Sequence, residues 1–269
     1  MRSATRARQT PITATLKTST TRATRYLVMT RTLSTLQHAR GNLTKRFLLR
    51  VWLPLIALSY FGTLTIAARL SPQSYNWRRK AISKLLYPGY DPKFHDVASF
   101  GVALTGLLIL PFADYIRRKL RKVAPRIVDA GAFTLGLGAI GLILAGLITS
   151  HPLHGTPAYP RLHEIIARTA AFALGAAMIT LWASAARGYH ASPARTSEWR
   201  WLLVSWSVVT LPALSVVVLR AAAGAHLGWS NPVYQKLQNR ALWPLGLWEW
   251  LGSAAVFLFL LSAVLFLPE

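Results

Sequence analysis

The chain has 269 residues, of which 53% are hydrophobic and only 14% are charged. Its 31 Lys and Arg residues outnumber 8 acidic residues, which gives a formal net charge of +23. A soluble domain usually carries about a quarter charged residues, so this composition excludes an ordinary soluble domain and is typical of a membrane protein. The basic residues lie beside apolar runs, which argues against nucleic acid as the partner. Without cysteine, disulfides and thiolate sites are excluded as well.

Residues 1–45 contain no acidic residue and are rich in Thr, Arg, Ser and Ala. This segment has no apolar face to bury, so we expect a disordered basic N-terminal tail. Its composition is compatible with an organelle transit peptide, with a basic cytoplasmic tail, or with translation that begins at Met29. A truncated chain starting at Met29 is expected to insert and purify like the full chain. Residues 46–269 are expected to form the membrane domain.

Six apolar segments are long enough to cross a bilayer, since a helix needs about 20 residues to span roughly 30 Å of hydrocarbon. They are Phe47–Leu70, Val97–Ile116, Val128–Thr149, Leu162–Ala186, Trp201–Ala223 and Gly246–Leu267. Pro54 is expected to kink the first segment. Gly136, Gly138 and Gly141 are expected to flatten one side of the third, so that a neighbouring helix approaches closely. The sequence therefore predicts an all-α, polytopic protein with six transmembrane helices.

Lys and Arg are concentrated in the tail, in 117–126 and in 187–200. By the positive-inside rule, these segments and both termini face inside, and the basic inner loops contact anionic lipid. The expected location is the bacterial plasma membrane. The main exception to this bias is WRRK at 77–80, in the connection 71–96. The surrounding WRRKAISKLL predicts a short basic amphipathic stretch at the membrane interface, with Trp77 as an anchor.

Polar and ionisable residues collect in the connections that are expected to face outside. The candidate site residues are His95, Asp96, His151, His154, His163, Glu164, Arg168 and Glu249. Such groups are costly to place at the mouth of a membrane helix, which favours a functional interpretation. We expect them to meet in one vestibule that binds a lipid or a small ligand, with His163 and Glu164 pointing into the bundle.

The alternative function is a metal-assisted hydrolase of a lipid-like substrate, with His151, His154 and His163 as candidate ligands. No HExxH motif is present, because His163-Glu164 is followed by Ile-Ile-Ala. The structural alternative is that the histidines bond loop carbonyls and that Glu164 pairs with Arg168 one helical turn later. The sequence assigns no cofactor, oligomeric state or reaction; bound metal in the purified protein would distinguish the two functions.

The order of these features resembles the bacterial integral-membrane family called domain of unknown function 998. The stretches AISKLLYPGYDPKFHDVASFGVALTGLLILPFADYIRR and LITSHPLHGTPAYPRLHEIIARTAAF carry the resemblance, with the glycine-rich span between them. The resemblance implies a six-helix membrane protein with no established reaction. A more distant likeness is to seven-helix membrane hydrolases of the alkaline ceramidase kind, which use Ser, Asp and a three-His zinc site. This chain departs from them in its six predicted spans and in lacking His-x-x-x-His on a late helix.

Overall fold

The computed structural model describes residues 43–72, 74–150, 159–191, 196–227, 231–232 and 244–267. Every regular element in these ranges is a helix. The predicted tail, including Met29, lies outside the described residues up to Asn42. Leu43, the first described residue, is buried, and α2 begins at Lys45.

The first membrane span runs without interruption over Lys45–Leu70. It is built from α2 (Lys45–Phe47), η1 (Leu48–Trp52), α3 (Leu53–Ala57), η2 (Leu58–Gly62) and α4 (Thr63–Leu70). Both η segments are wider π-helical turns, in which the Leu53 N–H donates to the Leu48 carbonyl and the Thr63 N–H to the Leu58 carbonyl. Pro54 has no N–H to donate and its ring crowds the preceding turn. The irregularity expected at Pro54 thus takes the form of a widened turn beside it.

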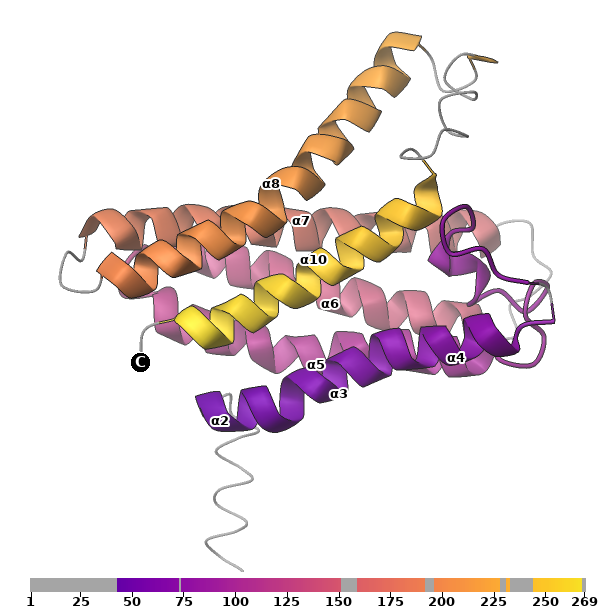
Figure 1. The fold of residues 1–269 in the computed structure, drawn as a ribbon, viewed down its shortest axis with the longest axis horizontal. Coiled ribbons are helices and arrows are strands. Elements are labelled where there is room, and N and C mark those ends of the chain that lie inside the picture. The colour runs from indigo at the N-terminus through magenta and orange to yellow at the C-terminus, as the bar shows by residue number, and fades with distance from the viewer. Residues whose placement is uncertain are drawn as a thin grey trace, which may run out of the picture. The chain divides into compact units, whose positions relative to one another are not determined.

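Five longer helices follow, each covering one predicted apolar run. They are α5 (His95–Leu120), α6 (Pro125–Ser150), α7 (Tyr159–Ala191), α8 (Thr196–Leu227) and α10 (Leu245–Phe266). Within the described residues, the first span, α5, α6, α7 and α10 are long and apolar enough to cross a membrane. The chain is therefore an all-α, multi-pass membrane protein. That α8 is the sixth span, and that both termini face inside, remain predictions. Figure 1 shows α8 changing direction near its middle, where Pro212 interrupts its hydrogen bonding.

The helices pack in chain order, and α10 closes the arrangement. α5 lies along α6 and α6 along α7, while α8 contacts α7 and α10. α10 also contacts η1, α3 and η3 of the N-terminal part, so the last helix reaches back to the first span (Figure 1). In the core, the buried Trp206 of α8 stacks on Phe259 of α10 with ring centroids 4.1 Å apart. Its indole N–H donates to the Phe259 carbonyl at 3.1 Å.

Glycines set the close approach of α6 to its neighbours. A Cβ added at Gly138 would lie 2.6 Å from Leu174, and one at Gly141 would lie 2.6 Å from Ala170, both on α7. The predicted flat side is therefore confirmed at these two positions, and it is wrong at Gly136, where an added Cβ would meet nothing within 4 Å. Residues three apart share a helix face, whereas residues two apart do not.

Two contacts show which helix ends lie together. The Leu247 N–H at the start of α10 donates to the Arg78 carbonyl in the connection after the first span. At the opposite end, the Lys45 ammonium donates to the Leu265 carbonyl at 2.8 Å. We call the first the loop end, where α5, α7 and α10 begin, and the second the basic end, which includes 117–126.

The connection at the loop end, which contains the predicted amphipathic stretch WRRKAISKLL, has little regular structure. Its regular part is a single 3-10 turn, η3 (Ile82–Lys84), after a tight turn at 77–79. Ile82, Leu85 and Leu86 are buried in a cluster with Leu64 of α4. The apolar residues of the stretch thus pack on the bundle.

Candidate functional site

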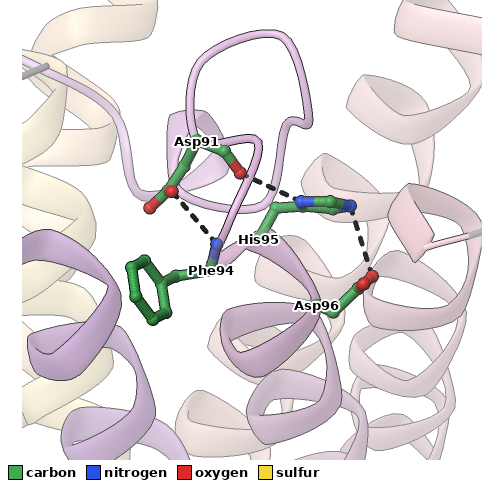
Figure 2. A network of polar contacts seen from close by, with 4 residues as sticks. All are labelled: Asp91, Phe94, His95 and Asp96. Carbon is green, nitrogen blue, oxygen red and sulfur yellow. Dashed lines mark hydrogen bonds and ion pairs between the residues drawn. The ribbon is translucent and has the colours of Figure 1, made fainter. Parts of the chain in front are cut away.

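The turn that leads into α5, residues Asp91–Asp96, brings two acids and a histidine together (Figure 2). One carboxylate oxygen of Asp91, Oδ1, accepts from the Phe94 N–H at 3.1 Å. The Asp91 carbonyl faces Nδ1 of His95 at 2.9 Å. Nε2 of His95 lies 3.2 Å from Oδ1 of Asp96. We call this set the α5 lead-in turn.

His95 bridges two hydrogen-bond acceptors in this turn. A neutral imidazole has one N–H, so both contacts are hydrogen bonds only when His95 carries a proton on each nitrogen or when Asp96 is protonated. The His95 side chain is 14% exposed, whereas that of Asp96 is 71% exposed. The imidazole is therefore largely enclosed by the protein, whereas the Asp96 carboxylate is exposed at the surface of the turn.

Asp91 is the least accessible acid of the turn. The residue is fully buried, and its second carboxylate oxygen, Oδ2, makes no hydrogen bond. Withdrawing a carboxylate oxygen from water without a donor is unfavourable by about 1–3 kcal/mol or more. Asp91 is not among the residues that the sequence selects for the site. The motif Tyr-Pro-Gly-Tyr-Asp-Pro indicates a turn there, but nothing in it signals that the acid is buried.

Glu249 lies one turn inside α10 and holds the connection at the loop end. Its Oε2 accepts from the Ile82 N–H at 2.5 Å. Beside it, the Leu247 N–H donates to the Arg78 carbonyl at 3.1 Å, which satisfies one of the free N–H groups at the helix start. The structure thus gives Glu249 an anchoring role between segments that are far apart in the sequence.

Tyr75 completes this anchor. Its hydroxyl donates to the Lys80 carbonyl at 2.9 Å and accepts from the Trp250 indole at 3.3 Å. Burial raises the pKa of Tyr75 to about 12; the hydrogen bond from Trp250 opposes this shift and the Glu249 carboxylate adds to it. Tyr75 is therefore a neutral phenol at physiological pH. Tyr75 was not selected from the sequence, and its one signal there is an aromatic residue two positions before Trp77.

Polar side chains also join the helices deeper in the bundle. The Ser59 and Thr105 hydroxyls lie 2.8 Å apart, joining η2 to α5. The Tyr60 and Ser253 hydroxyls lie 2.7 Å apart, joining η2 to α10. Such bonds between hydroxyls are typical contacts between membrane helices. The widened turn η2 therefore presents adjacent side chains to two different helices.

At the start of α7, neighbouring residues have different surroundings. Glu164 and Arg168 form an ion pair on an exposed face, as their spacing predicts. The two nitrogens of His163 are withdrawn from solvent and make no hydrogen bond of good geometry. The backbone of Ala145 in α6 interacts with the imidazole. Successive helix positions differ by about 100°, which explains why Glu164 points outward when His163 points to α6.

Side-chain contacts divide the predicted site residues into separate groups. His95 contacts Asp96, Glu164 contacts Arg168, and Glu249 contacts the connection. His151 and His154 lie outside the described residues. Within the ranges that the structure covers, no group of three His, Asp or Glu side chains is placed to hold a metal ion. One vestibule shared by all eight residues thus stays a prediction.

Comparison with known proteins places the chain in a family. No curated protein and no solved structure matches it. Residues 55–266 match the model of a family described as "Protein of unknown function (DUF998)", and this match runs from the first span to the end of α10. Because it covers most of the 269 residues, the chain belongs to the DUF998 family of multi-pass membrane proteins.

Proposed function

We propose that this membrane protein binds, at the α5 lead-in turn, a ligand that carries a primary ammonium group. The observation that supports the proposal is the buried Asp91 carboxylate with one oxygen, Oδ2, that has no hydrogen-bond donor. An N–H from a ligand would satisfy that oxygen. Ammonium fits better than a neutral donor, because it pairs with the charge of the buried carboxylate as well as donating a hydrogen bond.

Two kinds of molecule with a primary ammonium group have access to the loop end of a membrane bundle. One is the ethanolamine headgroup of a phospholipid in the adjacent leaflet, and the other is a small amine from the aqueous side. His95 and Asp96 lie beside Asp91 on the same turn, so either source would meet a polar surface that the helix start holds rigidly. The competing explanation is that Asp91 only caps the turn through Oδ1 and the Phe94 N–H.

Two substitutions separate binding from capping. Asp91→Asn keeps an oxygen for the Phe94 N–H and removes the charge, whereas Asp91→Ala removes both. Asp114→Asn is the matched control, because Asp114 pairs with Arg118 at the basic end. Each protein is placed in nanodiscs of phosphatidylcholine, with or without phosphatidylethanolamine, and its thermal unfolding midpoint is measured. Separate samples in phosphatidylcholine receive ethanolamine or tetramethylammonium, which has no N–H.

If the proposal holds, phosphatidylethanolamine or free ethanolamine raises the midpoint of the wild type by a few degrees, and tetramethylammonium does not. Asp91→Asn loses this response but keeps the midpoint in phosphatidylcholine, and Asp114→Asn keeps the response. A response to the lipid alone identifies the headgroup as the source, and a response to soluble ethanolamine identifies a small amine. Equal behaviour of the wild type and Asp91→Asn would overturn the proposal and leave Asp91 as a cap.

For the orientation, we propose that both termini and the basic end face the cytoplasm of a bacterial plasma membrane, where the basic end contacts anionic lipid. Its support is the concentration of cations there. Asp129 lies 2.7 Å from Arg117 and 3.4 Å from Arg121, whereas Lys122 and Arg126 form no ion pair among the described residues. Reporter fusions after Arg161 and Arg187 test it. The first is expected outside and the second inside, and the reverse result would refute this orientation.

A further inference from the structure

The connection at the loop end carries a group of exposed cations and aromatic residues, and the positive-inside rule does not explain the cations. Its members are Trp77, Arg78, Arg79, Lys84 and Tyr87, which we call the connection patch. Trp77 is 51% exposed and Tyr87 is 45% exposed, and the three cations are exposed as well. Arg78, Arg79 and Lys84 form no ion pair with any acid in the described part of the chain.

The patch is held rigidly although it contains little regular structure. The side-chain oxygen of Asn76 accepts from the N–H groups of Arg78 and Arg79, at 3.1 and 3.3 Å, which fixes the turn. The Arg78 carbonyl is bonded to the start of α10. Below the turn, Ile82 is buried. The exposed side chains therefore project from a backbone that is fixed on both sides.

Lys80 differs from the other cations of the segment, because its ammonium is bonded within the protein. Its ammonium bonds the Tyr90 hydroxyl and the Ser74 carbonyl, and it lies 4.6 Å from the centre of the Tyr90 ring. The guanidinium of Arg78 instead lies over the exposed Trp77 ring, 5.5 Å from its centre. One cation of the run WRRK is thus used internally, and its two neighbours are left for an external partner.

The position of the patch identifies that partner. The connection joins the end of α4 to the start of α5, so it lies where two membrane spans end. Trp and Tyr at this level insert among lipid headgroups, and guanidinium groups bind phosphate with two parallel hydrogen bonds. We propose that the connection patch binds the phosphates of anionic phospholipid in the leaflet at the loop end. This surface is independent of the Asp91 proposal, since it uses other residues and the opposite charge.

Quenching of Trp77 by brominated lipid tests the proposal. The full chain is reconstituted in phosphatidylcholine vesicles in which either phosphatidylglycerol or part of the phosphatidylcholine carries bromine near the headgroup end of its chains. The signal of Trp77 is the difference between the wild type and Trp77→Phe. The test variant is Arg78→Gln/Arg79→Gln/Lys84→Gln. The matched control is Lys119→Gln/Lys122→Gln/Arg126→Gln at the basic end, and Asp91→Asn is measured in parallel.

Trp77 is expected to be quenched more by brominated phosphatidylglycerol than by brominated phosphatidylcholine at equal fractions. The preference should fall by roughly fivefold for each cation removed, and the control triple variant and Asp91→Asn should keep it. If the test variant fails to fold, Arg79→Gln alone is measured, because the Arg79 side chain is exposed. Equal quenching by both lipids in the wild type, or an unchanged preference in the test variant, would overturn the proposal. Displacement of the lipid by millimolar inorganic phosphate would overturn it as well and would indicate a soluble anion.

Discussion

Gly246 and Gly252 lie on the same helix, and we predict opposite effects for the same substitution at each. A Cβ added at Gly246 would lie 2.3 Å from the Lys80 carbonyl oxygen and 2.9 Å from that of Trp77, which are backbone atoms that cannot rotate away. At Gly252 it would meet nothing within 4 Å. Gly246→Ala therefore has to displace the connection from the start of α10, whereas Gly252→Ala only raises the helix propensity of that position.

The magnitudes follow from these contacts. Overpacking at Gly246 costs about 1–3 kcal/mol, and the shift breaks the bond between the Leu247 N–H and the Arg78 carbonyl, which adds about 1 kcal/mol. The higher helix propensity of Ala over Gly offsets at most about 1 kcal/mol of this loss. The net loss of about 2 kcal/mol corresponds to a midpoint lowered by about 4–8 °C in a chain of this size. Gly252→Ala should raise the midpoint by about 1–4 °C.

Thermal unfolding in one detergent, followed by far-UV circular dichroism, measures both variants beside the wild type. Reversibility is checked by reheating, since an irreversible transition reports a rate instead of a free energy. The expected difference is refuted if Gly246→Ala is as stable as the wild type, or if the two variants shift the midpoint in the same direction by similar amounts. Either result would mean that the connection is not held against α10 as closely as the contacts of Gly246 and Leu247 indicate.

Two further predictions concern polar contacts. Burial raises the pKa of Tyr75 from 10.0 to about 12, so the phenol holds its proton more tightly in the folded state than in the unfolded state. The resulting contribution to the free energy of unfolding is complete below about pH 10 and is lost between about pH 10 and 12. The unfolding midpoint should fall more steeply over that range in the wild type than in Tyr75→Phe, and parallel curves would contradict the shift. For the Ser59–Thr105 contact, a cycle of Ser59→Ala and Thr105→Val should give a coupling near 0.6 kcal/mol, whereas additive effects would show that the bond contributes nothing.

The positions of the helices could be read from the sequence with good accuracy. The prediction Val97–Ile116 became His95–Leu120, and Gly246–Leu267 became Leu245–Phe266. This works because the thickness of the hydrocarbon sets the length of an apolar segment, and that length is visible in the chain without knowledge of any contact. The ion pair of Glu164 with Arg168 was predictable for a similar reason, since both residues lie within one helical turn.

The candidate site was predictable only in part, because its contacts join distant segments. The Ile82 N–H and the Glu249 carboxylate are 167 positions apart, and no local pattern connects them. The burial of Asp91 depends on how the lead-in turn packs, and the motif around it indicates only a turn. The widened turns of the first span also escaped prediction, since Pro54 predicts an irregularity without fixing its form. Sequence thus located the polar residues, and tertiary packing decided which ones meet.

The return of α10 to the first span has a consequence for biosynthesis. A ribosome releases α10 after every other helix, yet Tyr60, Ile82 and Arg78 find partners on it. During translation these groups wait in the membrane or at its surface with their hydrogen bonds unmade, or made to water. Completion of the bundle is therefore a late event that joins α10 to the first span and to the connection after it. A chain that stops before Leu245 would leave its earliest span exposed to the quality control of the cell.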